Sequence, residues 1–374
     1  MRQTADARDG VNVVGAGLAG LTAAVTLADH GIAVTVLEGA DRIGGRIGTT
    51  AGCDLGPTWV WPPWQPVVAT WLDHLGLNTF PQYDAGDGLL DGYGGPVRRH
   101  PLPGQDGIAR IVGGPAALTD ALAARLPDGA IRLGQTVTAV TQDAGGLVVT
   151  AGDHRIAAAH VILAVPPRLA LDRLAPPDAA LEAALRATPT WMARQAKVAA
   201  TWSRPFWRDA GLSGRVASRT GPLVEVHDHS PPTGGRGALF GFCGWDAATR
   251  AADPDGLRRA ILAQLMRCFG PEAGAPDDLI VMDWAQQPLI CSEADRLELP
   301  QHPKVGPDIL RQPHLNGRLW FAGAETAADH PGLIAGALLA GQTTAQRIIA
   351  EMSASRPEGR DARSLTSRRN DRGP

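Results

Sequence analysis

The chain has little lysine, little tyrosine and little net charge. Its 374 residues include only two lysines, Lys197 and Lys304, and two tyrosines, Tyr83 and Tyr93. The formal net charge is -3 with both signs dispersed, which argues against a nucleic-acid partner. Because arginine supplies nearly all the positive charge, a retained lysine suggests a demand that arginine does not meet.

Cysteine pairs and uninterrupted apolar runs are also scarce. The four cysteines form no CxxC pair, and the first ten residues contain no apolar signal core, so we expect a cytoplasmic protein. An apolar stretch at 11–28 approaches the length of a membrane span, but its glycines and its polar Asn12, Thr22 and Thr26 argue against a membrane anchor. With 44% hydrophobic residues, the chain is expected to form about two globular domains.

No metal site is predicted. His227 and His229 alternate in a strand-like segment and would lie on one face of it, but no third ligand follows at a recognisable spacing. We therefore interpret both histidines as polar residues near the end of a strand.

A dinucleotide-binding unit is predicted near the N-terminus. An apolar run leads into Gly15, Ala16 and Gly17, a small-residue helical pattern follows, and a second β-branched run ends at Glu38. Gly15 permits a tight turn, Gly17 lets backbone approach a pyrophosphate, and Gly20 lets helix and strand pack closely. Glu38, 18 residues beyond Gly20, is placed to accept hydrogen bonds from an adenosine ribose. These residues alone leave NAD and FAD open.

A second glycine-rich motif follows directly after this unit. Gly45 permits close backbone approach, and Arg42 and Arg46 are placed to meet phosphate or flavin oxygens. Together the two motifs resemble the flavin-containing amine oxidase family, relatives of monoamine and polyamine oxidases in the Rossmann-like FAD/NAD(P)-binding superfamily. Many members carry a basic residue two positions after the ribose-binding acid, where this chain has Ala40. The resemblance implies FAD as the cofactor.

Other segments of the chain match FAD-contacting parts of that family. They are the loop that passes the flavin ring, a position whose backbone contacts adenine, a tryptophan near the isoalloxazine, and the closing strand, turn and helix. In the closing motif an acid contacts the ribityl or pyrophosphate part of FAD, and the helix N-terminus points at the flavin. The implied FAD-binding residues are Gly56, Pro57, Thr58, Val137, Trp284, Gly323, Glu325, Leu333 and Ile334.

Lys197 is the implied catalytic residue. It matches the family's flavin-site lysine, and a Pro-Phe-Trp run follows it in the sequence as in the family. A compact ammonium of tunable pKa can hold a water against the flavin N5 atom, whereas a guanidinium is larger and stays protonated.

The substrate-facing residues differ from those of monoamine oxidases. Those enzymes place the amine between two aromatic rings, and the matching positions here are Ala294 and Leu333. Trp59 and Trp61 are candidate substrate-lining residues, with core packing as the alternative, and Trp64 is expected in the core.

A covalent flavin and an amino acid substrate are both disfavoured. Family members with cysteine-linked FAD have the cysteine at a position that matches Glu293, and Cys291 is two residues away, so we expect noncovalent FAD. Amino acid oxidases of the superfamily grip the substrate carboxylate with an arginine in the flavin-facing loop, where Trp59 stands here. Arg194 and Arg219 remain candidates to replace that arginine.

The predicted fold class is α/β combined with α+β. We expect a discontinuous Rossmann-like (GR2-type) FAD-binding domain of residues 1–80, 113–187 and 287–352. A substrate domain of residues 81–112 and 188–286 should contain an antiparallel or mixed sheet, and residues 353–374 should be a disordered tail. Most of the family's helical insertion is absent, so the helical roof should be shortened. The pocket would then be more open, or a partner chain, as in a homodimer, would complete it.

The resemblance implies an FAD-dependent oxidoreductase. The main hypothesis is an amine oxidase that converts an apolar or aromatic amine into an imine, with molecular oxygen as acceptor and hydrogen peroxide as by-product. Two alternatives stay open: an FAD-dependent desaturase or dehydrogenase of a biosynthetic intermediate on the same scaffold, and a flavin-bearing partner protein without turnover.

Overall fold

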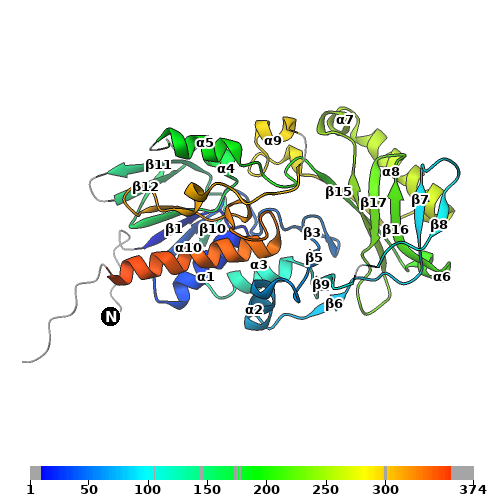
Figure 1. Ribbon diagram of the computed structural model, residues 1–374, viewed down its shortest axis with the longest axis horizontal. Coiled ribbons are helices and arrows are strands. Elements are labelled where there is room, and N and C mark those ends of the chain that lie inside the picture. Colours follow the sequence, from blue (N-terminus) through cyan, green and yellow to red (C-terminus); the bar gives the residue numbers. More distant parts are fainter. Residues whose placement is uncertain are drawn as a thin grey trace, which may run out of the picture.

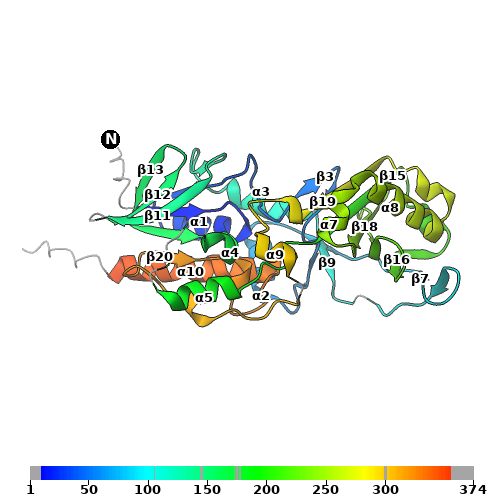
Figure 2. The ribbon, with the colours of Figure 1, turned by 90° about the horizontal axis from the view of Figure 1, so that it is seen from above.

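The computed structural model describes residues 10–104, 106–143, 146–171, 173, 176, 178–298 and 301–354. Two large β-sheets, one of five strands and one of seven, lie toward opposite ends of an elongated molecule (Figures 1 and 2). Short strands and loops connect the two ends, and the cavity described below lies between them.

A parallel five-stranded sheet forms the first end, as the strand pattern near the N-terminus predicts. Its strands lie in the order β10, β2, β1, β14, β20, and every neighbouring pair is parallel. These strands come from the beginning, middle and end of the chain, so the sheet is assembled from discontinuous segments. Their bounds are Ile131–Arg132 (β10), Val34–Leu37 (β2), Val11–Val14 (β1), His160–Leu163 (β14) and Leu319–Phe321 (β20).

Both faces of this sheet are covered. Side chains of each strand alternate between two cores: Val13 and Trp320 pack with helices, whereas Val14 and Phe321 pack with a small antiparallel sheet. The helices on the first face are α1 (Leu18–Asp29), α2 (Pro66–His74), α3 (Ala116–Ala123) and α10 (Ile334–Ala354). The second face contacts β11 (Val137–Asp143), β12 (Gly146–Ala151), β13 (His154–Ala158), α4 (Pro167–Leu171) and α5 (Ala179–Ala187).

A mixed seven-stranded sheet forms the second end. Its order is β19, β15, β18, β17, β16, β7, β8, and all neighbouring pairs are antiparallel except β16 and β7. One face packs on helices through a core that includes Trp202, Trp207 and Ile261. The strands are Asp278–Asp283 (β19), Ala196–Trp202 (β15), Gly237–Cys243 (β18), Leu223–Asp228 (β17), Leu212–Ser218 (β16), Asp87–Asp91 (β7) and Arg98–His100 (β8). The helices of this core are α6 (Phe206–Asp209) and α8 (Pro254–Phe269), and α7 (Ala247–Ala252) precedes α8 in the chain.

Short elements join the two ends. A hairpin of β3 (Thr49–Thr50) and β4 (Cys53–Asp54) precedes a small sheet of β5 (Trp59–Val60), β9 (Ala109–Ile111) and β6 (Thr79–Pro81). The helix α9 (Glu293–Leu297) lies near the start of β15 in Figure 1. Single turns of 3-10 helix occur at Pro271–Gly274, Trp284–Gln286, Asp308–Arg311 and Ala324–Thr326.

The predicted fold class is confirmed: a Rossmann-like parallel sheet is joined to a second, mixed sheet. The segment 81–112 forms strands and loops, and its described residues contain no helix, which agrees with a shortened roof. The division into the two predicted domains stays a prediction. No described helix is long and apolar enough to cross a membrane.

Two predictions about local structure were wrong. Trp64, expected in the core, is 61% exposed. Its N–H closes a turn onto the Trp61 carbonyl at 2.9 Å across two prolines, so the indole projects away from the core, toward Gly107. Residues 353 and 354, expected in the tail, end helix α10, and the rest of that tail lies outside the described residues.

Candidate cofactor and active site

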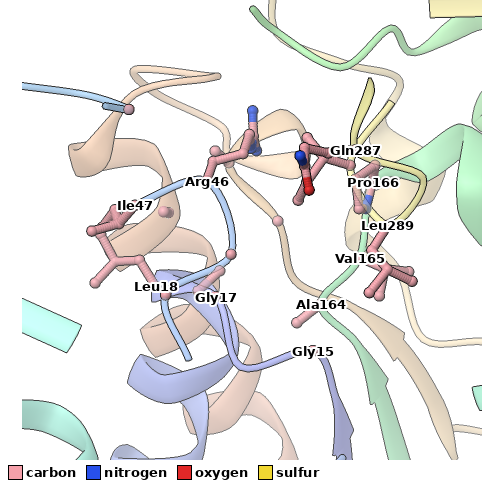
Figure 3. A pocket seen from close by; sticks show the side chains of 18 of the residues that line it. Gly15, Gly17, Leu18, Arg46, Ile47, Ala164, Val165, Pro166, Gln287 and Leu289 are labelled. Carbon is pink, nitrogen blue, oxygen red and sulfur yellow. The ribbon is translucent and has the colours of Figure 1, made fainter. Parts of the chain in front are cut away.

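A cavity of about 560 Å³ lies at the carboxyl ends of the parallel strands. Gly15 follows β1, Glu38 follows β2, Ala164 follows β14, and Gly323 lies two residues beyond β20; all four line the cavity. Gly15 and Ala164 lie next to each other in the cavity wall (Figure 3), and a Cβ at Gly15 would lie 2.7 Å from the Ala164 carbonyl oxygen. In open α/β sheets, ligands bind in a crevice at this edge.

The first motif folds as a cradle for an anion at the start of α1. Gly15 has φ of +105°, and a Cβ at Gly20 would lie 2.0 Å from the Gly15 carbonyl oxygen, so both positions require glycine. Gly17 is the N-cap of α1 and makes no side-chain cap, which leaves the N–H groups of the first turn free for a phosphate. Gly20 itself is not in the cavity wall: it packs helix on strand, as predicted.

Glu38 is buried at the cavity wall and oriented by two backbone groups. The Ala16 N–H donates to one carboxylate oxygen at 2.7 Å, and the Ala40 N–H donates to the other at 2.9 Å. A carboxylate has further acceptor capacity on each oxygen, so Glu38 retains the means to hold ribose hydroxyls. Ala16 thus acts through Glu38 and does not line the cavity.

The two arginines of the second motif have different partners. Arg42 donates to the backbone carbonyls of Ile43, Gly45 and Ile47 and so closes its own loop beside the cavity. Arg46 instead reaches across to Glu325, which comes from the turn before α10.

Arg46 and Glu325 form a bidentate ion pair that joins distant parts of the chain. The guanidinium donates to both carboxylate oxygens at 2.6 and 2.8 Å, and the Trp191 N–H also donates to Glu325 at 3.2 Å. Glu325 is 3% exposed and Arg46 has 26% side-chain exposure. A direct contact of Glu325 with the flavin stays a prediction, because its carboxylate already accepts three protein hydrogen bonds.

Lys197 lies on β15 and reaches the cavity from the second sheet. Its ammonium donates to the Gly56 carbonyl at 2.8 Å and to the Thr58 hydroxyl, and it lies 4.2 Å from the centroid of the Phe240 ring. Burial lowers the pKa of Lys197 to about 7, because the charged form loses its hydration. The flavin-loop residues Gly56, Pro57 and Thr58 line the cavity beside it.

Trp59 forms an oriented aromatic wall next to Lys197. Its indole N–H donates to Gln82 at 2.9 Å, and Gln82 donates in turn to the Asp228 carbonyl at 2.8 Å. The Trp59 ring meets Phe240 edge-on with centroids 5.4 Å apart. Trp59 and Trp61 both line the cavity, so the pocket interpretation of these two residues fits the structure better than core packing.

The remaining predicted cofactor residues lie in the same wall. Trp284 is fixed by a hydrogen bond from its indole N–H to the Leu55 carbonyl at 2.9 Å. The others that line the cavity are Gly45, Val137, Gly323, Leu333 and Ile334.

Ala294 does not belong to the site. It lies exposed on α9, and the described cavity wall from this part of the chain runs from Gln287 to Ile290. The wall segment ends at Ile290, and α9 then begins at Glu293 and carries Ala294 on its exposed surface, so matching Ala294 to a substrate-facing position of the family was wrong. Cys291 is buried and hydrogen-bonded to the Ser292 carbonyl, outside the wall.

Several lining residues were not anticipated. Trp191, Met192 and Gln195 enter the wall from the turn before β15, and Phe242 enters it from β18. Met192 has φ of +60°, which is uncommon for a non-glycine residue and places it in a tight turn at the cavity. Phe242 is the cross-strand partner of Lys197, a pairing that becomes visible only once the register is known.

The donor groups of the cavity fit FAD. The glycine cradle and the uncapped start of α1 suit a pyrophosphate, Glu38 suits the ribose, and the start of α10 suits the polar edge of a flavin ring. These features occupy the first end of the molecule, while Lys197 and Trp59 face them from the second.

Comparisons with known proteins decide the family. The profile described as "Flavin containing amine oxidoreductase" matches residues 18–105 and 90–349. This chain belongs to that family. It is an FAD-dependent oxidoreductase.

Individual relatives extend this picture. AofH of Mycobacterium tuberculosis, named a putative flavin-containing monoamine oxidase, is 26% identical over 444 residues, covering 91% of this chain and 96% of AofH. Putrescine oxidase of Kocuria rosea is 27% identical over 395 residues, covering 73% of this chain and 81% of that protein. Cyclohexylamine oxidase of Brevibacterium oxydans superposes with a TM-score of 0.78 at 22% identity, covering 92% and 100%, which shows the shared fold.

Proposed function

We propose that this member of the flavin amine oxidase family oxidises an apolar or aromatic primary amine to an imine, with oxygen as the acceptor and hydrogen peroxide as the by-product. The observation that carries the proposal is the chemistry of the wall around Lys197. There the lining includes the aromatic and aliphatic side chains of Trp59, Trp61, Phe242 and Leu333, and its polar members Thr58 and Gln195 carry no charge. Such a wall favours the apolar part of an amine.

A second substrate charge has no partner in that part of the cavity. The carboxylates among the described lining residues are Glu38, Asp41 and Glu325, and all belong to the cofactor end. A diamine would bring its second ammonium against aromatic rings without a paired carboxylate. We therefore propose a monoamine in preference to a diamine.

An amino acid substrate also lacks its expected anchor. Arg194 donates to the Glu298 carbonyl and Arg219 stacks on Tyr93, and the described cavity wall includes neither arginine. The lining arginines are Arg42, Arg46 and Arg173, each hydrogen-bonded to protein groups. A substrate carboxylate would thus compete with existing hydrogen bonds.

The residues of this chain would act by placement. Bound FAD would take the hydride equivalent of the amine and pass the electrons to oxygen. Trp59, fixed by Gln82, would hold the apolar group and exclude water from the reacting carbon. Lys197, anchored by Gly56 and Thr58, would hold a water at the cavity wall with its remaining donor capacity.

Matched pairs of substrates test this proposal. Hexylamine and hexamethylenediamine differ by one ammonium, and phenethylamine and phenylalanine differ by one carboxylate. With the purified, FAD-loaded chain, we expect hydrogen peroxide from hexylamine and phenethylamine and much less from their charged counterparts. Faster turnover of the diamine or of the amino acid would contradict the proposed substrate class, and no peroxide from any amine would contradict the proposed reaction.

We also propose that FAD is held without a covalent bond, since the described cavity wall includes no cysteine. Acid precipitation should leave the flavin in the supernatant; a yellow pellet would contradict this. A homodimer that completes the shortened roof stays a prediction, which sedimentation of the loaded chain would test.

A further inference from the structure

A group of buried polar side chains lies directly behind Lys197. Asp54 is on β4, Arg110 is on β9, and His229 follows β17, and each is buried. The Asp54 N–H donates to His229 Nε2 at 3.0 Å, and an Asp54 carboxylate oxygen lies 3.4 Å from the same nitrogen. The described wall of the cavity includes none of the three residues, and the proposed reaction does not use them.

Phe240 connects this group to Lys197. The Lys197 ammonium lies 4.2 Å from the centroid of the Phe240 ring, and the His229 ring meets the same ring edge-on at 5.3 Å. Lys197 also donates to the carbonyl of Gly56, which lies two residues beyond Asp54 on the same segment. Charges in such a buried compartment interact more strongly than charges in water.

Positive and negative charges are not equal in number in this buried compartment. The titratable groups that face Lys197 from the packed elements are Cys53, Asp54, Arg110, His227 and His229. Burial raises the pKa of the Cys53 thiol to about 11, and burial lowers the pKa of both imidazoles, so these three groups are neutral near pH 7. Arg110 keeps its positive charge, as arginines do. Burial also raises the pKa of Asp54 to about 6, so near pH 7 the Asp54 carboxyl is mostly ionised while Lys197, with a pKa of about 7, is about half protonated. Among the described residues that face Lys197, one carboxylate therefore favours the charged lysine and one fixed cation, Arg110, disfavours it.

We propose that Asp54 is a positioning residue that holds Lys197 in its charged form at the cavity wall, and that Arg110 opposes it. Without Asp54, two cations would share a buried compartment, and lysine is the one of the two that can release its proton. A neutral lysine amine keeps two N–H groups, enough for the hydrogen bonds to Gly56 and Thr58, so loss of the charge removes the third donor, the one proposed to hold a water at the cavity wall. The consequence for turnover rests on the proposed function; the charge state itself does not.

The low lysine content allows a direct measurement. Protein grown with lysine labelled with carbon-13 at the ε position gives two signals, from Lys197 and from the exposed Lys304, which serves as an internal reference. A pH titration of the FAD-loaded, full-length chain by NMR then reports the pKa of Lys197 without any amine. We expect Asp54→Asn to lower the pKa of Lys197 by about one unit or more. We expect Arg110→Gln to raise it, because a neighbouring positive charge is removed.

Another buried carboxylate, Asp91, provides a control that distinguishes a specific effect on Lys197 from general destabilisation. Asp91 lies on β7, four strands from β15 in the same sheet, and accepts hydrogen bonds from Ser218 and Arg267. Asp91→Asn should lower stability and leave the Lys197 signal unchanged. If neither Asp54→Asn nor Arg110→Gln moves the titration of Lys197, or if the shifts have the opposite signs, the proposal is wrong. Should Asp54→Asn fail to fold, Arg110→Gln still tests the opposing charge: a Lys197 pKa that does not rise in that variant would make the proposal wrong.

The same variants separate this proposal from the proposed function. A shifted Lys197 titration with no amine oxidation in the wild-type chain would support the role of Asp54 and contradict the amine oxidase proposal. Amine oxidation by the wild-type chain, together with a Lys197 titration that neither variant shifts, would support the amine oxidase proposal and contradict the role of Asp54. If both hold, the pH profile of anaerobic flavin reduction should move to lower pH in Asp54→Asn, in the same direction as the NMR titration.

Discussion

Removing the charge of Glu325 should loosen the junction between the start of the chain and its end. Glu325 lies before α10, and its carboxylate accepts two hydrogen bonds from Arg46 and one from the Trp191 N–H. Breaking a fully buried pair by changing one partner costs roughly 3–5 kcal/mol, because the other charge stays buried without a partner. Arg46 has 26% side-chain exposure and can be partly hydrated, and glutamine keeps one acceptor oxygen. We therefore expect Glu325→Gln to lower the free energy of unfolding by about 2–3 kcal/mol.

Urea unfolding of the cofactor-free chain measures this loss, and a surface ion pair provides the control. Glu182 pairs with Arg186 one helical turn away on α5, and both side chains are largely in solvent. Glu182→Gln should change the unfolding free energy by less than about 0.5 kcal/mol. A double-mutant cycle with Arg46→Met should give a clear coupling energy between Arg46 and Glu325. If Glu325→Gln costs no more than Glu182→Gln, the pair does not join the two segments energetically.

Three further variants test other parts of the structure. Gly20→Ala places a Cβ 2.0 Å from a backbone oxygen, so it should lower the free energy of unfolding by about 1–3 kcal/mol or more and weaken FAD binding. In Gly104→Ala the nearest atom to the new Cβ is 3.6 Å away, so this control should change the stability little. Equal unfolding midpoints for the two variants would refute the reasoning. Trp59→Ala should raise the KM for apolar amines, whereas Trp64→Ala, which removes an exposed indole, should not, so equal KM values in the two variants would count against the aromatic wall. Burial lowers the pKa of His229 well below its usual value, so below about pH 6.5 the unfolded chain takes up a proton that the folded chain does not. The free energy of unfolding should therefore fall as the pH drops below about 6.5, by up to about 1.4 kcal/mol per pH unit. His229→Gln should make this pH dependence, measured by urea unfolding, shallower, and an unchanged slope would contradict the reasoning.

The cofactor end of the molecule was predictable because its requirements are local. Gly15 and Gly20 are needed by a turn and by a close contact, and Glu38 ends a strand at a fixed spacing from them. Strand, turn, helix and strand follow one another in the sequence, so their order already gives the geometry of the site.

The substrate end was less predictable because its residues meet through long-range pairing. Phe242 faces the cavity because β18 pairs with β15 in a register that no short motif specifies. Ala294 was misplaced because a match to a family position does not reveal that this residue lies on the exposed side of α9. Trp64 was misplaced because two prolines turn its backbone outward. The role of Asp54 behind Lys197 depends on β4, β9 and the end of β17 meeting at one point, which the sequence alone does not show.

The central claim is that an apolar monoamine reduces the flavin in this cavity. Its most direct test is to mix the FAD-loaded chain anaerobically with hexylamine, and separately with hexamethylenediamine, and to follow the visible absorbance of the flavin. The proposal predicts that hexylamine bleaches the flavin rapidly and that the diamine does so far more slowly at equal concentration. A flavin that stays oxidised with hexylamine and with every other monoamine, or that is bleached faster by the diamine, would contradict it.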